Sequence, residues 1–195
     1  MRVTVMVSGG GTNLQALLDA QEAGKLGSAR VCAVIASKPG VYALERAAKH
    51  GVPSYVVCRK DFTDADAWES ALLAALEDTR PDLIVLAGYL SILGNAVVQK
   101  YAGRIINVHP ALLPSFGGRG MYGLRPHTAA LERGVKLTGA TVHYVNEIPD
   151  GGEIIAQKAV EILPGDTPES LQKRVMEQAE RVLLPEAVAG LSTSL

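Results

Sequence analysis

The sequence has 195 residues, 48% of them hydrophobic, which is enough for one buried core and too short for two ordinary domains, so we predict a single domain over residues 1–195. The formal net charge is −1 at pH 7, and no stretch clusters Lys and Arg. This composition argues against a nucleic-acid or membrane-surface partner.

The first apolar run and the two cysteines indicate a protein that stays inside the cell. Residues 3–7 run straight into a glycine turn, so they are too short for an export signal or a membrane span. Cys32 and Cys58 lie in apolar, strand-like runs, where a thiol usually behaves as a small buried hydrophobic group. We therefore expect a cytoplasmic protein without a disulfide bond.

Short β-branched runs alternate with helical patterns over the first half of the chain. The predicted strands are residues 3–7, 31–36, 55–58, 83–87 and 104–108. The predicted helices are residues 13–22, 42–50, 64–77 and 95–101. Because this alternation is typical of βαβ units, we predict an α/β, Rossmann-like three-layer sandwich with a mostly parallel sheet.

The pattern changes after Gly134. Residues 137–145 and 153–163 are both strand-like and have no helix between them, which predicts a C-terminal antiparallel pair at one side of the sheet. Thr167 and Pro168 are typical of the start of a final helix. Residues 115–123 contain four glycines and are predicted to form a mobile loop, which leaves open a role as a lid over the substrate.

A glycine turn, residues 8–13 (SGGGTN), lies between the first predicted strand and helix. The free N–H groups and the positive end of the dipole at a helix start favour an anion such as phosphate. The turn is not a Walker A loop, and Leu14 occupies the place of the third glycine of a dinucleotide fingerprint. The alternative is a tight turn that only requires positive φ, with Thr12 or Asn13 capping the helix.

Asn107 and His109 lie two residues apart at the end of a predicted strand, so their side chains project from the same face. The carboxyl ends of parallel strands line the ligand crevice of an open sheet. Asp150 precedes two glycines in the connection between the two late strands, where a carboxylate can face His109. An amide donor and an imidazolium suit the stabilisation of an oxyanion in acyl transfer.

The role of Asp150 has two interpretations. It either raises the pKa of His109, or holds one tautomer and relays a proton through water. A purely structural interpretation of all three residues, as a strand cap, a core histidine and a turn residue, also stays open at this point.

The remaining histidines have more ambiguous positions. His143 alternates along a predicted strand and faces either the site or a structural environment, and His127 begins a predicted helix where it either lines the site or supports the fold. His50 is placed at a helix C-terminus. No His, Cys, Asp or Glu cluster has the spacing of metal ligands, so we expect no metal.

Four motifs in this order resemble the phosphoribosylglycinamide formyltransferases, a branch of the folate-dependent formyltransferases. The motifs are residues 7–15 (VSGGGTNLQ), 86–93 (LAGYLSIL), 107–114 (NVHPALLP) and 150–152 (DGG). The resemblance implies formyl transfer from 10-formyltetrahydrofolate, as co-substrate, to the amine of glycinamide ribonucleotide in purine (IMP) biosynthesis.

The resemblance also implies a role for each site residue. Asn107 and His109 stabilise the tetrahedral intermediate, and Asp150 tunes His109. The substrate is bound by Gly10, Gly11, Thr12 and Asn13 at its phosphate and by Glu180, assisted by Glu177, at its ribose. The folate lies against Leu90, Ser91, Ile92, Leu93, Asn107, Asn146, Glu147, Ile148, Pro149 and Asp150.

Three positions depart from the pattern of the family. Ser91 and Ala65 stand where many members have arginine, and Arg59 and Lys60 are close enough in sequence to substitute. The last helix carries one extra residue between Arg174 and Pro185, which affects the assignment of Glu180.

Related classes remain as alternatives. A formyltetrahydrofolate deformylase uses the same Asn, His and Asp chemistry with water, but normally has a further N-terminal domain, whereas the first strand here is predicted to start at Val3. Methionyl-tRNA formyltransferases are longer and have a C-terminal RNA-binding domain. A non-catalytic nucleotide-binding module would give no reason for Asn107, His109 and Asp150 to meet. The oligomeric state is left open, with a homodimer among the options.

Overall fold

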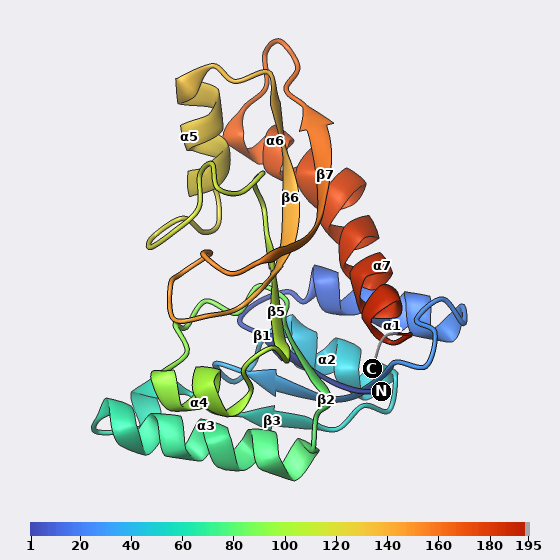
Figure 1. The fold of residues 1–195 in the computed structure, drawn as a ribbon, viewed down its shortest axis with the longest axis vertical. Helices are drawn as coiled ribbons and strands as arrows, with labels where there is room; N and C mark the ends of the chain where they lie inside the picture. Colours follow the sequence, from blue (N-terminus) through green and yellow to red (C-terminus); the bar gives the residue numbers. More distant parts are fainter. Residues whose placement is uncertain (194–195) are drawn as a thin grey trace.

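Seven strands form one sheet in the computed structural model, which describes residues 1–193 (Figure 1). The strand order is β3-β2-β1-β4-β5-β6-β7. The first five strands in the chain are parallel, β6 is antiparallel to β5, and β7 is antiparallel to β6. The strands are β1 (Arg2–Val7), β2 (Arg30–Ala36), β3 (Ser54–Val56), β4 (Leu83–Leu86), β5 (Ile105–His109), β6 (Leu137–Tyr144) and β7 (Ile154–Glu161). The predicted parallel set and its antiparallel pair are both confirmed.

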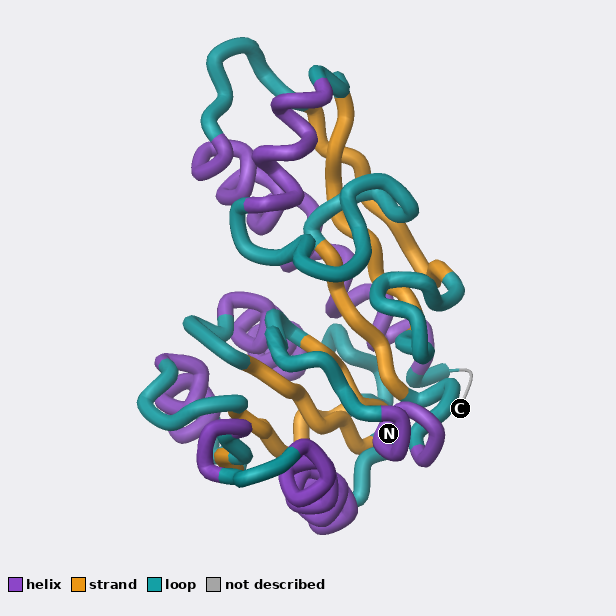
Figure 2. Tube along the Cα trace, turned by 90° about the vertical axis from the view of Figure 1, so that its left-hand side faces the viewer, coloured by secondary structure: helices purple, strands orange, loops and turns teal. Residues whose placement is uncertain are grey.

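Helices cover both faces of the sheet, which confirms the three-layer architecture (Figures 1 and 2). One face is covered by α1, α2, α6 and α7, and the other by α3 and α4. The helices are α1 (Thr12–Glu22), α2 (Tyr42–Lys49), η1 (Arg59–Asp61), α3 (Ala65–Thr79), α4 (Asn95–Lys100), α5 (Arg125–Arg133), α6 (Pro168–Val175), η2 (Met176–Glu180) and α7 (Arg181–Leu191). None of the helices within residues 1–193 combines the length and hydropathy needed to cross a bilayer.

Two hydrophobic clusters hold the layers together, and the alternation along β1 divides residues between them. Val3, Val5 and Val7 face the cluster under α1, α2 and the C-terminal helices, whereas Met6 faces the cluster under α3 and α4. Each fully buried side chain of this kind stabilises the fold by about 1.5–3 kcal/mol relative to exposure. Because both faces of these strands are buried, their sequences read as continuous apolar runs rather than alternating ones.

The C-terminal part extends the molecule beyond the parallel strands. In Figures 1 and 2 the ribbon of β6 and β7 continues past the rest of the sheet, with α5 and α6 beside its far end. Thr167 caps α6 by accepting a hydrogen bond from Ser170 N at 3.2 Å, and Pro168 is the first helical residue, as the sequence predicts.

A π-helical turn, η2, joins α6 to α7 between Arg174 and Pro185, where the sequence predicts one extra residue. A π turn has i→i+5 hydrogen bonds and so accommodates one residue more than an α-helical turn. The helix continues in the same direction on either side of Met176–Glu180, and the extra residue stays a prediction that a π turn would accommodate. Both cysteines, Cys32 and Cys58, are free, as expected.

Candidate active site

A cavity of about 500 Å³ lies at the carboxyl ends of β1, β4 and β5. The strand order reverses between β1 and β4, and ligands of open α/β sheets bind at such switch points. The predicted site residues that line this cavity are Gly10, Gly11, Thr12, Asn13, Leu90, Ser91, Ile92, Leu93, Asn107, His109, Asn146, Glu147, Ile148, Pro149, Asp150 and Glu180. One cavity therefore collects residues from the beginning, middle and end of the chain.

The glycine turn has the geometry of an anion site. Gly11 has φ of 71°, and a Cβ there would lie 2.7 Å from the Cβ of Ala43, so a larger residue does not fit. The backbone N–H groups of Gly10, Gly11, Thr12 and Asn13 donate to no acceptor among residues 1–193. The alternative interpretation was a tight turn with positive φ, capped by Thr12 or Asn13. The positive φ is present at Gly11, but neither of these two side chains caps the helix. Thr12 Oγ1 donates instead to Met176 Sδ at 3.3 Å.

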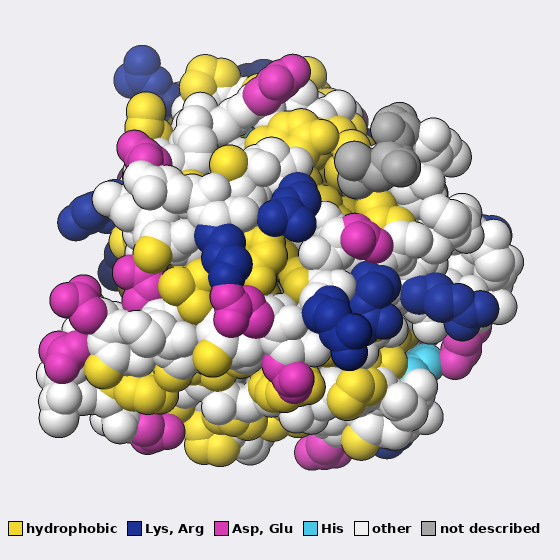
Figure 3. All heavy atoms as spheres, turned by 60° about the horizontal axis from the view of Figure 1, so that its bottom comes forward, with side chains coloured by type: hydrophobic (Ala, Val, Ile, Leu, Met, Phe, Trp, Pro, Cys, Tyr) yellow, Lys and Arg dark blue, Asp and Glu magenta, His cyan; other side chains and the backbone are white. Residues whose placement is uncertain are grey.

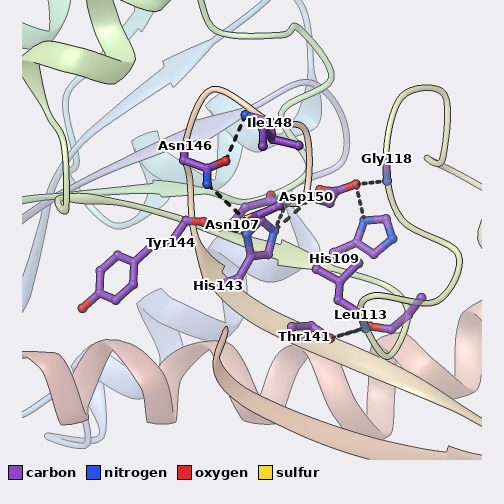
Figure 4. Close-up of polar contacts among 12 residues, drawn as sticks. Asn107, His109, Leu113, Gly118, Thr141, His143, Tyr144, Asn146, Ile148 and Asp150 are labelled. Carbon is purple, nitrogen blue, oxygen red and sulfur yellow. Dashed lines mark hydrogen bonds and ion pairs between the residues drawn. The ribbon is translucent and has the colours of Figure 1, made fainter. Parts of the chain in front are cut away.

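The predicted catalytic residues meet in a cluster of four side chains (Figure 4). Asp150 Oδ2 lies 3.5 Å from His109 Nδ1, and Asp150 Oδ1 lies 3.4 Å from Asn107 Nδ2. His143 completes the cluster, because its Nε2 lies 3.2 Å from Asn107 Nδ2 and 3.6 Å from Asp150 Oδ1. The β5–β6 register pairs Asn107 directly with His143, which brings the second imidazole into the site.

Two tight backbone features place Asp150. This residue has φ of 56°, a conformation that L-residues rarely adopt and that often marks functional positions. A Cβ on Gly152 would lie 1.8 Å from Tyr144 O, so glycine is required where the connection passes the end of β6. The Gly118 N–H then donates to Asp150 Oδ2 at 2.8 Å, which ties the loop of residues 115–123 to the cluster.

The electrostatics of His109 bear on the first interpretation of Asp150, that it raises the pKa of the imidazole. Burial lowers the pKa of His109 below its ordinary value, although Asp150 and the Phe116 carbonyl act in the opposite direction. Asp150 therefore raises this pKa, as the first interpretation predicts, but removal of the ring from water outweighs the attraction, so the net pKa lies below the ordinary value. His109 Nε2 donates to Phe116 O at 2.9 Å, so the proton of the neutral ring is assigned to Nε2.

The carboxylate of Asp150 remains ionised in this environment. Burial alone would raise its pKa, but the two imidazoles, His143 and His109, and the N–H of Gly118 together hold the pKa below its ordinary value. His143 Nδ1 lies 2.8 Å from Tyr144 O, which assigns its proton to Nδ1 and leaves Nε2 to accept from Asn107. Both amide hydrogens of Asn107 thus already face protein acceptors, at long distances that a substrate oxygen can improve upon.

His127, on α5, is a third buried histidine in the wall of the cavity, after His109 and His143. It is 0% exposed, and neither of its ring nitrogens has a hydrogen-bond partner among the described residues. Burial, with a contribution from His109, lowers its pKa to about 4. The imidazole is therefore neutral at physiological pH. Of the two alternatives for His127, the structure places it in the wall of the cavity, where it is fully enclosed.

Glu180 and Glu177 have different environments. Asn13 Nδ2 donates to Glu180 Oε2 at 2.8 Å, which links the glycine turn to the last helix, and burial raises the pKa of Glu180 against this hydrogen bond. Glu177 is exposed and does not line the cavity, so no contact in the structure supports its predicted assistance at the ribose. The inward face of this helix instead presents Gln172 and Met176, four residues apart, together with Glu180.

The opposite wall of the cavity is apolar and exposed. Leu90, Ile92 and Ile148 are 58%, 61% and 66% exposed. The Leu90 N–H donates to Ser8 Oγ at 2.9 Å, which connects this wall to the glycine turn. Exposed large apolar side chains around a cavity mark a ligand-binding surface.

Arg59 and Lys60, which are close enough in sequence to substitute for the family arginines, do not reach the cavity. Ala65 starts α3 outside the cavity, and Arg59 donates to the Phe62 carbonyl at 3.0 Å rather than lining the cavity; Lys60 does not line it either. Arg119, in the loop of residues 115–123, is the cation that lines the cavity among residues 1–193.

On the face shown in Figure 3, acidic and basic side chains are interspersed among hydrophobic ones. Within residues 1–193, no group of three or more His, Cys, Asp and Glu side chains is arranged to hold a metal ion.

The fold and the site define a class: α/β proteins whose crevice combines an anion-binding turn with an acid–base cluster. Residues 1–188 match the family described as Formyl transferase. A phosphoribosylglycinamide formyltransferase from Haemophilus influenzae is 39% identical over 181 residues, which cover 93% of this chain and 82% of that protein. The chain therefore belongs to the phosphoribosylglycinamide formyltransferase family.

Solved structures and longer relatives agree with this placement. The crystal structure of glycinamide ribonucleotide transformylase 1 from Symbiobacterium toebii has a TM-score of 0.92 and 38% identity, and covers 100% of this chain and 88% of that chain. A formyltetrahydrofolate deformylase from Pseudomonas syringae has a TM-score of 0.87 and 29% identity, covering 99% of this chain and 61% of that chain. The trifunctional purine biosynthetic protein adenosine-3 of Drosophila melanogaster is 44% identical over 97% of this chain, which spans 14% of its length.

Proposed function

We propose that this chain transfers the formyl group of 10-formyltetrahydrofolate to the amine of glycinamide ribonucleotide in purine biosynthesis. The observation that carries the proposal is one cavity that connects an anion-binding turn, the Asn107, His109 and Asp150 cluster, and an apolar wall. A phosphate, a reacting formyl group and a pterin ring each require one of these three parts. The membership of the family supports the same reaction.

The two ends of the cavity suit the two substrates. The free N–H groups of the glycine turn bind the phosphate, and the buried carboxyl group of Glu180 accepts from the ribose hydroxyls. Leu90 and Ile92 contact the pterin, while the backbone groups of residues 146–150 pair with its polar edge.

The central cluster performs the transfer. The amine lone pair forms a C–N bond to the formyl carbon, and the negative charge that develops on the formyl oxygen is stabilised by N–H donors of Asn107 and His109. Breaking of the bond between the formyl carbon and the folate nitrogen releases tetrahydrofolate. The proton that the amine loses ends on that nitrogen, and the ionised Asp150 favours the charged form of His109 and relays the proton through water.

The loop of residues 115–123 controls access to this donor. In this structure the Phe116 carbonyl occupies Nε2 of His109, the atom that would otherwise donate to the formyl oxygen. Phe116 has φ of 55°, and Gly118, Gly120 and Gly123 also have positive φ, so the loop holds its shape in conformations that most residues disfavour. A substrate oxygen replaces the Phe116 carbonyl as the loop moves, which gives the loop the role of a lid.

Formation of tetrahydrofolate, followed by absorbance with and without glycinamide ribonucleotide, tests the proposal. Release that depends on the amine is the expected result. Equal release without the amine would identify a formyltetrahydrofolate deformylase, and no release under either condition would favour a nucleotide-binding module.

The accompanying properties are a single domain, a cytoplasmic location, small-molecule partners and a reaction without a metal. Dialysis against a chelator should leave the rate unchanged, and a rate restored only by added metal would contradict this. Sedimentation at several concentrations distinguishes a monomer from the homodimer that the sequence leaves open.

A further inference from the structure

Helix α2 contacts the outer side of the glycine turn, away from the cavity. The Ala43 N–H donates to Gly9 O at 3.3 Å, and Arg46 Nε donates to Gly10 O at 2.8 Å. The missing side chain of Gly11 allows this approach, because a Cβ there would lie 2.7 Å from the Cβ of Ala43. Helix α2 therefore holds two successive carbonyl groups of the turn.

These two hydrogen bonds fix where the neighbouring N–H groups point. In a trans peptide the C=O and N–H bonds point in opposite directions. When the carbonyls of Gly9 and Gly10 face α2, the N–H groups of Gly10 and Gly11 face the other way, toward the cavity that both glycines line. Successive N–H groups oriented in this manner form a concave site for an anion.

Arg46 is itself held in one position. Its Nη1 donates to Gln15 Oε1 at 2.8 Å, and Gln15 Nε2 donates to Asp19 Oδ1 at 2.7 Å. Its guanidinium also lies 4.8 Å from the centre of the Tyr42 ring. The fork of one guanidinium thus joins α2 to the turn and to α1, a geometry that the single ammonium of lysine does not reproduce.

The positive charge of Arg46 is not neutralised by an ion pair. Within residues 1–193, no carboxylate oxygen lies within 4.0 Å of its guanidinium nitrogens. The guanidinium that carries this charge is hydrogen-bonded to the turn. From there the charge attracts an anion that binds on the cavity side of the turn. This charge adds to the partial positive charge of the α1 N-terminus.

We propose that Arg46 is a positioning residue that makes the enzyme specific for a phosphorylated substrate. It orients the Gly10 and Gly11 N–H groups toward the phosphate and supplies a positive charge behind them, without touching the substrate. The identity of that substrate rests on the proposed function, whereas the orientation of the turn does not.

The test compares three variants: Arg46→Met, Arg46→Lys and Lys49→Met. Lys49 is the matched control, because it is exposed on the same helix and contacts Tyr42 rather than the turn. For each variant, calorimetry gives the Kd of inorganic phosphate, and kinetics give kcat and KM for glycinamide ribonucleotide and for the unphosphorylated riboside. Circular dichroism confirms the fold.

For Arg46→Met we expect both the phosphate Kd and the KM for the ribonucleotide to rise about tenfold to a hundredfold, because this change corresponds to the loss of one charge-assisted hydrogen bond. We expect kcat to change by less than about twofold, because uniform binding is lost rather than transition-state stabilisation. The KM for the riboside should not change, Lys49→Met should match the wild type, and Arg46→Lys should recover only part of the loss.

An unchanged phosphate Kd in folded Arg46→Met would overturn the proposal, as would an equal loss of affinity for the ribonucleotide and the riboside. Full recovery in Arg46→Lys would show that charge alone acts and would overturn the positioning role. If Arg46→Met does not fold, Arg46→Lys decides by the same measurements. Because phosphate binding is measured without turnover, a failure of the proposed reaction stays distinguishable from a failure of this proposal.

Discussion

Replacement of Asp150 by Asn removes one charge from the centre of the site with almost no change in shape. The carboxylate accepts from Gly118 N–H at 2.8 Å and lies 3.5 Å from His109 and 3.6 Å from His143. The amide retains an oxygen for Gly118 but no longer stabilises a positive charge on either imidazole. Removal of a preorganised electrostatic group of this kind costs about 3–4 kcal/mol in the transition state, so we expect kcat to fall about 10²- to 10³-fold.

The same substitution has a smaller and pH-dependent effect on stability. Because the folded-state pKa of Asp150 is below its ordinary value, the ionised carboxylate stabilises the fold above the unfolded-state pKa. This contribution is lost as the pH falls through the folded-state pKa. We expect Asp150→Asn to lower the free energy of unfolding by about 1–2 kcal/mol at neutral pH, and the difference from wild type to shrink in acid.

Initial rates of tetrahydrofolate formation across the neutral pH range, with urea unfolding at neutral and acid pH, measure both effects. Glu177→Gln is the matched control, since Glu177 is an exposed carboxylate outside the cavity. A wild-type kcat with an unchanged pH profile in Asp150→Asn would refute the role of Asp150 in tuning His109. A loss of the same size in Glu177→Gln would show that the effect is not specific to the cluster.

Three further substitutions have expected outcomes. His109→Ala should remain folded and lose about 10²- to 10⁴-fold in turnover, and near-normal rates would reject His109 as catalytic. The pKa of His127 is lowered to about 4 in the fold, so acid should cost up to about 3 kcal/mol of stability as the pH falls from the ordinary histidine pKa through about 4. Urea unfolding of His127→Gln should show a shallower dependence of stability on acid pH. Identical curves of stability against pH for the variant and the wild type would contradict this. Gly11→Ala places a Cβ 2.7 Å from the Cβ of Ala43, at a position with φ of 71°. It should therefore weaken phosphate binding and lower the free energy of unfolding by about 2 kcal/mol. A phosphate Kd equal to that of the wild type, measured by calorimetry, would show that the turn adapts.

The fold can be predicted from local patterns, because the spacing of apolar residues in strands and helices, and the residues that form turns, are properties of short segments. The alternation of apolar runs with helical patterns predicts the parallel strands, and the absence of a helix between residues 145 and 153 predicts the antiparallel pair. Asn107 and His109 share a face because strand side chains alternate, which requires no knowledge of the neighbours. The roles that the resemblance assigns to these residues stay predictions, as do the single domain and the location.

Two features of the site depend on contacts between distant segments. His143 joins the cluster because the β5–β6 register pairs it with Asn107, and register is not readable from either strand alone. Glu180 reaches Asn13 and Glu177 does not, because the π turn sets which side chains face inward. The sequence does name His143 as a candidate, because it alternates along its predicted strand, but leaves open whether it faces the site.

The sequence by itself determined the layers of this protein, the turn that carries the free N–H groups, and the residue types that meet at the strand ends. Only the tertiary structure decided the charge of those residues. The pKa of His109 depends on how completely the assembled fold removes the ring from water and on how near it brings Asp150, and burial outweighs the carboxylate. Desolvation is produced by all the segments that surround a group, so no motif of a few residues encodes it.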